Sequence, residues 1–333
     1  MHKKILSILI ISTILYGCSS HEAITPDNPE PLPIDVSDSI EEKTFPFTGK
    51  PMTSNNTSLP FMAIIENSKD ARPQSGLSNA DIVFETMAEG GISRFIALFH
   101  MEIAKEIGPI RSVRPYFIEI SQSLDLPFAH CGGSEDALKS INLNNLMSLN
   151  EMKFGDAYWR DNSKKPPHNL YTSSEKITSL LTEKQFNKIP TSNLKFDSSY
   201  WNNKDFKNCS DIKINMNRYY DTSYKYEEGI YKKFIGEDIF IDKSNNSEIK
   251  LSNIVIQQTT ITLSKDKIHV EIPLVGEGNG YVLSQGKVIP ILWSKKDSNS
   301  VTELKDENGN IVSLSEGKTW WNIVDKSNEI SLH

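Results

Sequence analysis

The pattern of apolar residues changes near residue 200, and this change limits the folds that the chain can adopt. Between about residues 59 and 195, short apolar runs alternate with longer amphipathic stretches. From about residue 210 to 330, short β-rich runs are separated by turn signals such as Asn308-Gly309. Alternating strands and helices are typical of an α/β domain, and closely spaced hairpins are typical of an antiparallel sandwich or open barrel. We therefore predict an α+β chain with an α/β domain at 59–195 and a mainly antiparallel β domain at 210–330.

Local signals place the elements inside each domain. In the first domain, apolar runs predict strands at residues 61–66, 81–87, 94–100 and 127–131. Pro115 in a first helical turn, Ser134 as an N-cap and a capping box that begins at Thr172 predict three helices. In the second domain, β-rich runs predict strands at residues 211–216, 223–226, 230–234, 253–261, 269–274, 281–283, 288–293, 311–314 and 319–324.

The first eighteen residues are typical of a lipoprotein signal peptide. Two lysines precede an apolar run at residues 5–15, which is too short to span a bilayer, since spanning takes about 20 apolar residues. Leu15-Tyr16-Gly17-Cys18 then resembles a lipobox, with a bulky tyrosine at its variable position. We predict a signal peptide at 1–17, lipidation of Cys18 and anchoring on the extracytoplasmic face of the cell membrane. The alternatives are an uncleaved signal anchor and a cytosolic protein with an apolar start.

Residues 18–58 are predicted to be a disordered tether between the lipid and the folded part. This stretch contains six prolines and many Ser, Thr and Asn residues, with little that could form a core. Forty flexible residues have an r.m.s. reach of roughly 35 Å. The folded part can therefore stand off the membrane and still meet it.

Charge and cysteine content exclude some classes of partner. The net charge of -7 becomes -9 when Lys3 and Lys4 leave with the signal peptide, because 34 basic residues then face 43 acidic ones. Nucleic acid favours a basic surface, so we predict no nucleic-acid partner. Cys131 and Cys209 either pair in an oxidising compartment or stay free. CxxC and HExxH spacings are absent from the sequence, so we predict neither a metal nor a cofactor.

Arginine is concentrated in the first domain. Only six of the 36 basic residues are Arg, and five of these fall between residues 72 and 160, where only three Lys occur. Arginine is required where a planar, bidentate donor holds a carboxylate or phosphate. The domain therefore either binds an anion or contains internal pairs with acidic residues. The candidate anion-binding arginines are Arg72, Arg94, Arg111, Arg114 and Arg160, and the available acidic partners are Asp81, Glu85, Glu89, Asp156 and Asp161.

Polar loops surround these arginines. Arg111, Ser112 and Arg114 lie just before the helix that Pro115 opens, and helix N-termini present free N–H groups to anions. These three residues could form a phosphate or pyrophosphate cradle, and Ser134, after a Gly-Gly turn, could form another. A stiff loop at residues 159–171 offers His168 as a general base and Asp161 as a base or metal ligand. The alternative is that Asp161 pairs with an arginine and that His168 bonds a backbone carbonyl.

Long stretches of the chain resemble the YerB-like bacterial lipoproteins. They are ARPQSGLSNADIVFE, EGGISRF, IGPIRSVRPYF, HCGGSEDAL, KPPHNLYTS, GEGNGYVLSQGK and DENGN…LSEGKTWW. The resemblance extends from about residue 59 to 328. It implies a two-domain lipoprotein and supplies no activity.

A more distant similarity links the first domain to the LytR-CpsA-Psr enzymes. Those enzymes transfer glycopolymers from a polyprenyl-pyrophosphate carrier with the help of arginines and an Asp-held magnesium ion. Ser112-Val113-Arg114-Pro115 is similar to their Ser-Ile-Pro-Arg-Asp with Arg and Pro exchanged, and Tyr116 stands where their Asp would be. The Gly132-Gly133 segment fits their GG segment. The similarity implies bound magnesium only if the transferase function holds.

Three functions therefore remain open, and the sequence does not decide whether the chain is an enzyme. An envelope-associated binding or accessory protein predicts exposed arginines that converge on an anionic ligand or a protein partner. A phosphotransferase-like enzyme acting on a polyprenyl-pyrophosphate-linked glycopolymer predicts a carboxylate or metal site beside them. A purely structural lipoprotein predicts that the arginines are buried in internal pairs. The sequence favours the binding protein.

Overall fold

The computed structural model of the protein describes residues 43–52, 58–188 and 192–333, and residues from 42 onward form one compact unit. The predicted signal peptide, Cys18 and residues 18–42 of the predicted tether lie outside the described residues. In the part of the chain that the structure describes, no helix has the length and apolar character that a bilayer crossing requires.

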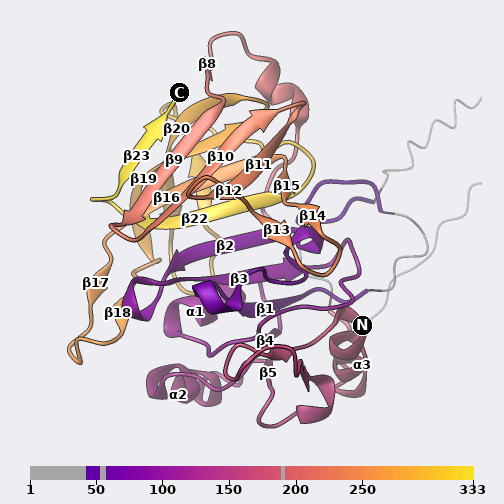
Figure 1. The fold of residues 1–333 in the computed structure, drawn as a ribbon. Helices are drawn as coiled ribbons and strands as arrows, with labels where there is room; N and C mark the ends of the chain where they lie inside the picture. Colours follow the sequence, from indigo (N-terminus) through magenta and orange to yellow (C-terminus); the bar gives the residue numbers. More distant parts are fainter. Residues whose placement is uncertain (1–42, 53–57, 189–191) are drawn as a thin grey trace, which may run out of the picture. The chain divides into compact units, whose positions relative to one another are not determined.

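A large mixed sheet runs through the middle of this unit (Figure 1). Its strands lie in the order β21-β20-β19-β16-β22-β2-β3-β1-β4-β5, and β8 pairs with β20. The strands from the first half are β1 (Phe61–Glu66), β2 (Ile82–Met87), β3 (Ser93–Phe99), β4 (Phe128–His130) and β5 (Ser148–Asn150). Those from the second half are β8 (Lys207–Asn208), β16 (Asn253–Thr259), β19 (Gly276–Ser284), β20 (Lys287–Lys295), β21 (Glu303–Lys305) and β22 (Thr319–Asp325).

A second, antiparallel sheet is built from the second half alone, in the order β12-β11-β10-β9-β23 with β15 beside β11. Its strands are β9 (Asp211–Asn217), β10 (Tyr220–Glu227), β11 (Ile230–Ile235), β12 (Asp238–Ile239), β15 (Lys250–Leu251) and β23 (Glu329–Leu332). Three short hairpins are β6 (Trp159–Arg160) with β7 (Leu170–Tyr171), β13 (Ile241–Asp242) with β14 (Ser247–Glu248), and β17 (Thr262–Leu263) with β18 (Val270–Glu271).

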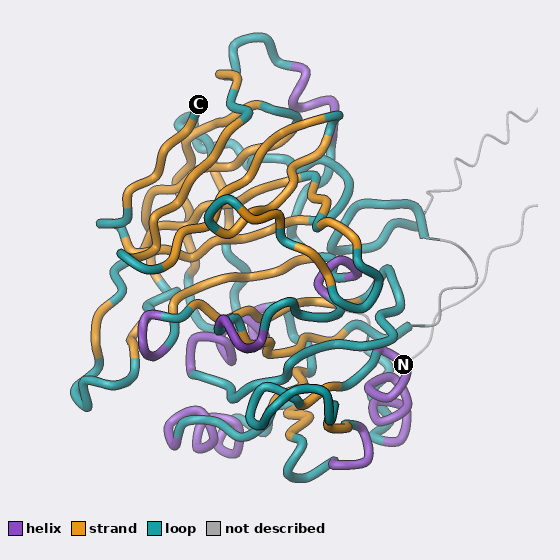
Figure 2. Tube along the Cα trace, viewed as in Figure 1, coloured by secondary structure: helices purple, strands orange, loops and turns teal. Residues whose placement is uncertain are grey.

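The two faces of the large sheet are covered by different elements. Side chains alternate along a strand, so Trp320 of β22 packs toward the second sheet, whereas Trp321 packs toward the opposite face. Helices α1 (Pro115–Ser123) and α2 (Glu135–Leu143) contribute to the core on the Trp321 side. Helix α3 (Ser174–Glu183) contributes to the core on the Trp320 side. Figure 2 shows these three helices beside the strands of the first half and the second sheet beside those of the second half.

Strand β22 joins the two halves of the chain. It lies between β2 and β16 and pairs in parallel with both, with Phe84 opposite Trp321 and Val255 opposite Trp321 on the other side. The predicted α+β class with a largely antiparallel second half is confirmed. The structure adds that the predicted boundary between 195 and 210 separates two segments that share one sheet.

Most predicted elements of the first half are present. The strands at 61–66, 81–87, 94–100 and 127–131 correspond to β1 to β4, and Pro115 occupies the first turn of α1. Ser134 caps α2 by accepting from the Ala137 amide, as predicted. The capping box is displaced: Ser173 caps α3, because the Thr172 hydroxyl instead donates to the Ala157 carbonyl.

Two predictions need correction. Residues 311–314 do not form a strand, because Val312 and Leu314 are buried in an irregular segment that makes only isolated bridges. The predicted tether is too long at its C-terminal end, because residues 43–52 belong to the folded structure. Phe47 is fully buried, and Phe45 packs edge-on against the His100 ring with 5.1 Å between the centroids.

Candidate functional site

Three of the predicted arginines meet at one end of the large sheet. Glu66 ends β1 and lies opposite Arg94, near the start of β3. Arg111 and Arg114 come from the segment that leads into α1, and Glu89 comes from the loop between β2 and β3. We call these residues, Glu66, Glu89, Arg94, Arg111 and Arg114, the arginine cluster.

Glu89 is shared by two arginines of the cluster. Its Oε2 lies 3.3 Å from Nη2 of Arg94, and its Oε1 accepts from Nε of Arg114. Burial alone would raise the pKa of Glu89, but Arg114 and Arg94 together hold this pKa below its ordinary value. The lowered pKa means that the carboxylate is ionised at neutral pH. The side chains of Glu89, Arg94 and Arg114 are only 12–17% exposed, so the carboxylate is also mostly shielded from water. Gly90 and Gly91 follow with φ angles of 69° and 70°, a left-handed turn that glycine adopts without strain.

The Tyr116 hydroxyl lies beside this pair of arginines and is buried without a hydrogen-bond partner among the described residues. Burial raises the pKa of Tyr116, and the charges of Arg94, Glu89 and Arg114 also act on it. The hydroxyl is therefore a neutral donor. A buried polar group that lacks a partner costs about 1–3 kcal/mol, so this end of the cluster is incomplete as it stands.

Glu66 is the second carboxylate of the cluster. Its Oε1 accepts from Nη2 of Arg111 at 2.9 Å, and its Oε2 lies 2.8 Å from Nε of the same guanidinium. Nδ1 of His168 lies 2.9 Å from Oε2, and the Ser68 hydroxyl donates to Oε1 at 2.9 Å. The structure therefore places His168, a predicted site residue, against the Glu66 carboxylate of the cluster, where the alternative interpretation expected a backbone carbonyl.

Ser68, His168 and Glu66 are the residue types of a hydrolase triad, but their geometry differs from that of a triad. Both the Ser68 hydroxyl, at 3.4 Å, and the Glu66 carboxylate approach the same ring nitrogen, Nδ1 of His168. In a triad the carboxylate orients one nitrogen while the other accepts the nucleophile's proton. This arrangement supports an ion-pair network and gives no nucleophile–base relay.

The remaining predicted site residues lie apart from the shared carboxylate Glu89. Arg72 donates to the side-chain and backbone oxygens of Asn67 and stacks 5.3 Å from the Tyr220 ring centroid. Arg160 donates to Asn169 and is 46% exposed. Ser134 caps α2, and Ser112 contributes its backbone carbonyl, which accepts from Nη1 of Arg94 at 3.0 Å.

Asp161 is paired on the surface. Its carboxylate lies 2.9 Å from Nζ of Lys243 and accepts from the Ser163 amide, and these contacts hold its pKa well below the usual range. Such a weakly basic carboxylate is poorly suited to take a proton at neutral pH. The predicted partner, an arginine, is replaced by a lysine from the second half.

The residues at the place where the distant similarity implies magnesium do not fit that ion. Tyr116 offers a neutral hydroxyl where an aspartate would stand, and the charged groups near it are the guanidinium groups of Arg94 and Arg114 and the single carboxylate of Glu89, which both arginines already share. Magnesium prefers carboxylate and phosphate oxygens. Within the described ranges, no group of three or more His, Cys, Asp and Glu side chains is arranged to hold a metal.

The arginine cluster carries an excess of positive charge. Its three arginines supply three positive charges against two negative charges from Glu66 and Glu89, which leaves +1. This local excess contrasts with a chain of net charge -7. The site is therefore electrostatically suited to one further anionic group.

A carboxylate outside the cluster, Glu85, lies deeper in the structure and is completely paired. Lys233 of β11 reaches it across the two sheets with 2.9 Å between Nζ and Oε2, and both side chains are fully buried. The Tyr220 hydroxyl, the Ser93 hydroxyl and Nε1 of Trp320 also donate to the carboxylate at 2.5, 2.8 and 2.8 Å. Burial would raise the pKa of Glu85, but the charge of Lys233 and the hydrogen bonds from Tyr220, Lys233 and Ser93 hold it below its ordinary value. The pair joins the two sheets.

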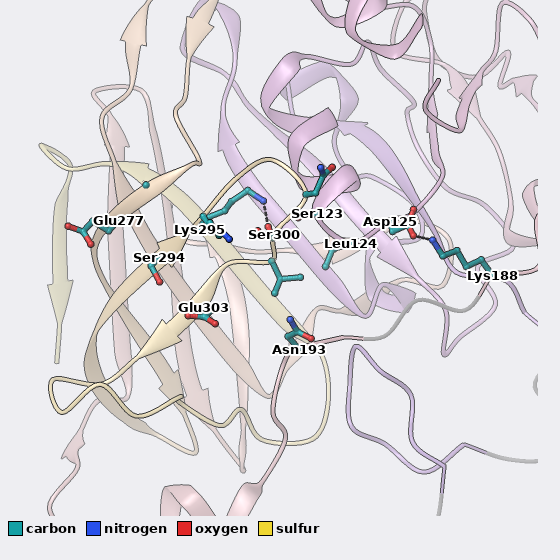
Figure 3. Close-up of a pocket in the computed structure, with 14 residues that line it drawn as sticks. Ser123, Leu124, Asp125, Lys188, Asn193, Glu277, Ser294, Lys295, Ser300 and Glu303 are labelled. Atoms are coloured by element: carbon teal, nitrogen blue, oxygen red, sulfur yellow. Dashed lines mark hydrogen bonds and ion pairs between the residues drawn. The ribbon is translucent and has the colours of Figure 1, made fainter. Parts of the chain in front are cut away.

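A groove of about 970 Å³ opens elsewhere, between the end of α1 and strands β19 to β21 (Figure 3). Lys295 and Glu303 line it, and Lys295 bonds the Ser300 carbonyl, while Asp125 and Lys188 form an ion pair at its side. Its described lining contains both charge signs and no arginine. The groove is thus separate from the arginine cluster.

The two cysteines of the folded part are free thiols. Sγ of Cys131 lies 3.4 Å from a carboxylate oxygen of Glu151, whereas Sγ of Cys209 lies 3.6 Å from the Asp211 carbonyl. The disulfide between Cys131 and Cys209 that the sequence left open does not form in this structure.

Sequence reasoning missed Glu66, Tyr116 and Lys233 as functional or structural partners. Glu66 ends an apolar strand, and a charge at the end of a buried run was the available signal. Tyr116 was noted only as a departure from another family. Lys233 lies in a lysine pair in the strand Ile230–Ile235, with no local sign that one of the two is buried.

Comparisons with known proteins agree with this fold. Residues 47–187 match the family described as "Protein of unknown function (DUF3048) N-terminal domain", and residues 211–321 match its C-terminal domain. "Putative lipoprotein YerB" of Bacillus subtilis (strain 168) is 31% identical over 297 residues, which cover 87% of this chain and 88% of that protein. The crystal structure of YerB from Bacillus subtilis matches with a TM-score of 0.77 at 29% identity, covering 87% of this chain and 99% of that one.

Proposed function

Because the chain belongs to the YerB-like family with DUF3048 domains, we propose that it is an envelope lipoprotein that binds an anionic ligand at the arginine cluster. It is anchored through Cys18 on the extracytoplasmic face of the membrane. One observation carries the binding function: Arg94 and Arg114 share the single carboxylate of Glu89, and the buried Tyr116 hydroxyl beside them lacks a partner among the described residues. The ligand is a phosphate, pyrophosphate or carboxylate group.

Glu89 acts in this proposal as the resting counter-ion of the site. An incoming phosphate accepts bonds from the guanidinium groups of Arg94 and Arg114, which match its geometry, and from the Tyr116 hydroxyl. The Glu89 carboxylate then moves into solvent. Gly90 and Gly91 permit this movement, because glycine has several backbone conformations of similar energy, and a Cβ at Gly90 would meet open space.

The purely structural alternative accounts for less of the geometry. It explains the pairing of Arg111 with Glu66 and of Arg160 with Asn169. It does not explain the excess charge of +1 or the buried Tyr116 hydroxyl, which has no partner among the described residues. A binding site explains both, because the ligand would supply the missing negative charge and the missing acceptor. Since the residues around Tyr116 do not fit magnesium, we derive no transfer reaction, and the phosphotransferase function stays a prediction.

Pyrophosphate titration of a protein comprising residues 42–333 tests the binding function. We expect Glu89→Gln to bind inorganic pyrophosphate about tenfold more tightly than wild type, because the internal competitor loses its charge; tenfold corresponds to about 1.4 kcal/mol. Arg114→Gln should bind at least tenfold more weakly. Arg160→Gln is the matched control, an exposed arginine outside the cluster, and should bind as wild type does. The rise in melting temperature on addition of pyrophosphate, measured with and without magnesium, gives a second readout.

Either of two results would contradict the proposal. One is the absence of pyrophosphate binding by both wild type and Glu89→Gln. The other is equal weakening by Arg114→Gln and Arg160→Gln, which would indicate charge screening without a site. The anchor is tested separately by metabolic labelling with a fatty acid, where Cys18→Ala should lose the label.

A further inference from the structure

Exposed apolar side chains gather on three loops beside the arginine cluster. Nine large hydrophobic residues are exposed among the described residues, and five of them lie on these loops. They are Ile92 in the β2–β3 loop, Tyr219 in the β9–β10 turn, and Leu263, Ile268 and Val275 in or just after the β17–β18 hairpin, with exposures of 42, 79, 65, 63 and 43%. We call these five residues and their loops the loop face.

Contacts at the Glu89-Gly91 turn hold the three loops together. Nε2 of His269, at the tip of the β17–β18 hairpin, lies 3.8 Å from Oε1 of Glu89. Nδ2 of Asn217, at the start of the β9–β10 turn, donates to the Gly91 carbonyl at 2.8 Å. Figure 1 shows this hairpin projecting beside the β2–β3 loop. The loop face therefore lies next to the carboxylate that occupies the proposed anion site.

Basic side chains accompany the apolar ones on the same loops. Arg218 stacks on the Tyr219 ring at 4.5 Å, and Lys265 and Lys267 flank the hairpin tip and are exposed. Of the two acids on the hairpin, Asp266 is bonded to His269 and Ser264, and Glu271 is exposed. Exposed Leu and Ile side chains next to Lys, Arg and Tyr are the composition of surfaces that lie in the headgroup region of a bilayer.

We propose that the loop face rests on an anionic bilayer and that the anion bound by Arg94 and Arg114 is the phosphate of a membrane lipid. This inference rests on the proposed anion-binding function and names its ligand. Leu263 and Ile268 insert among the acyl chains, while Arg218, Lys265 and Lys267 lie at the phosphate level. The three basic residues of the loops exceed the two acids of the hairpin by one charge. This excess favours an anionic bilayer over a neutral partner, because each basic residue near an anionic surface adds to the attraction.

The predicted anchor keeps the bilayer within reach of this face. From Cys18 to Lys43, the first described residue, the chain advances by 25 residues (43 − 18). A chain of that length spans at most about 90 Å even when fully extended. The membrane that would hold a lipidated Cys18 is therefore within reach of the loop face.

Vesicle sedimentation of residues 42–333 tests this inference, with vesicles of phosphatidylcholine alone or mixed with phosphatidylglycerol. We expect wild type to bind the mixed vesicles at least tenfold more tightly than the neutral ones. The double variant Leu263→Ser/Ile268→Ser should lose at least tenfold in binding to mixed vesicles. The matched control is Leu143→Ser/Met152→Ser, which removes two residues of 85 and 75% exposure far from the loops in sequence, and it should bind as wild type does.

Parallel titration with inorganic pyrophosphate separates this inference from the proposed function. The loop variant should keep wild-type pyrophosphate affinity, because Leu263 and Ile268 do not contact the arginines in our proposal, and thermal unfolding checks that it is folded. Pyrophosphate binding without any preference for mixed vesicles would overturn the bilayer inference alone and direct the search to soluble anions or an anionic protein. If wild type binds neither pyrophosphate nor vesicles, both proposals are overturned. Equal losses in the loop and control variants would show general hydrophobic adsorption and would also overturn the inference.

Discussion

Two carboxylates four residues apart, Glu85 in β2 and Glu89 just beyond it, have opposite surroundings. Glu85 and its partner Lys233 are both fully buried, and hydrogen bonds from Tyr220, Ser93 and Trp320 complete the network. Glu89 is 17% exposed and is shared by two arginines. The Tyr116 hydroxyl beside it is buried without a partner in the part of the chain that the structure describes.

This difference separates a fixed contact between the two sheets, which we call the joint, from a binding site. A fully satisfied buried polar network fixes one arrangement of the elements that contribute to it, and Glu85 and Lys233 belong to different sheets. A network with a missing acceptor and excess positive charge gains stability when an outside anion completes it. The Glu85 network should therefore respond to mutation through stability, and the Glu89 network through affinity.

The largest expected effect is on the buried joint. Lys233→Met should lower the free energy of unfolding by about 3–5 kcal/mol, because it leaves the Glu85 carboxylate buried without its cation. Urea unfolding followed by tryptophan fluorescence measures this, since Trp320 contacts Glu85. Arg114→Gln, in the arginine cluster, is the comparison and should lower the free energy of unfolding much less. Equal losses in the two variants would remove the distinction between joint and site.

Replacing a tyrosine by phenylalanine should change the free energy of unfolding in opposite directions in the two networks. Tyr116→Phe removes a buried hydroxyl without a described partner and should raise the free energy of unfolding by about 2 kcal/mol. Tyr224→Phe removes a hydroxyl that donates to Asn322 at 2.8 Å and should lower it by about 2 kcal/mol. Thermal unfolding measures both values.

Ligand binding sharpens this comparison. Tyr116→Phe should weaken pyrophosphate binding, whereas Tyr224→Phe should leave it unchanged. A loss of stability in Tyr116→Phe would mean that its hydroxyl has a structural acceptor, such as a bound water, and would argue against a vacant ligand position.

Acid should weaken both networks. The folded-state pKa values of Glu85 and Glu89 lie below the ordinary value of 4.5, so each carboxylate contributes stability above pH 4.5 that is lost as the pH falls toward its folded pKa. One group contributes at most about 1.4 kcal/mol per pH unit. Unfolding of wild type, Glu85→Gln and Glu89→Gln between pH 7 and 3 tests this. We expect the stability advantage of wild type over each variant to shrink below pH 4.5. A constant advantage would mean that these carboxylates titrate normally.

Much of the fold was predictable because its signals are local. Strands β1 and β3 are continuous apolar runs, and Pro115 and Ser134 mark helix starts by their own chemistry. The parallel pairing of β22 with β2 was not predictable, since it joins residues more than 200 positions apart without a local pattern. The strand prediction at residues 311–314 was wrong because the alternate apolar residues Val312 and Leu314 are typical of a strand. The sequence does not show that the backbone of this segment makes only isolated bridges.

The candidate site was predictable in part for a similar reason. Scarcity of arginine elsewhere drew attention to Arg94, Arg111 and Arg114, and the structure brings these three together. Composition could not show which acids would meet them, because Glu66 and Glu89 arrive from separate strand ends. The burial of Tyr116 depends on how α1 packs, which the sequence does not state.

The smallest expected effect concerns Ser134, which the sequence assigned both to a helix cap and to an anion cradle. Ser134→Ala should cost about 1 kcal/mol, because its side chain caps α2 by accepting from the Ala137 amide. Ser173→Ala, which removes the equivalent cap of α3, is the matched control and should cost about as much. Pyrophosphate affinity should stay unchanged in both variants if the binding site is confined to the arginine cluster. A loss of affinity in Ser134→Ala alone would extend the site to the N-terminus of α2, because Val113, beside Arg114, forms a bridge with Gly133.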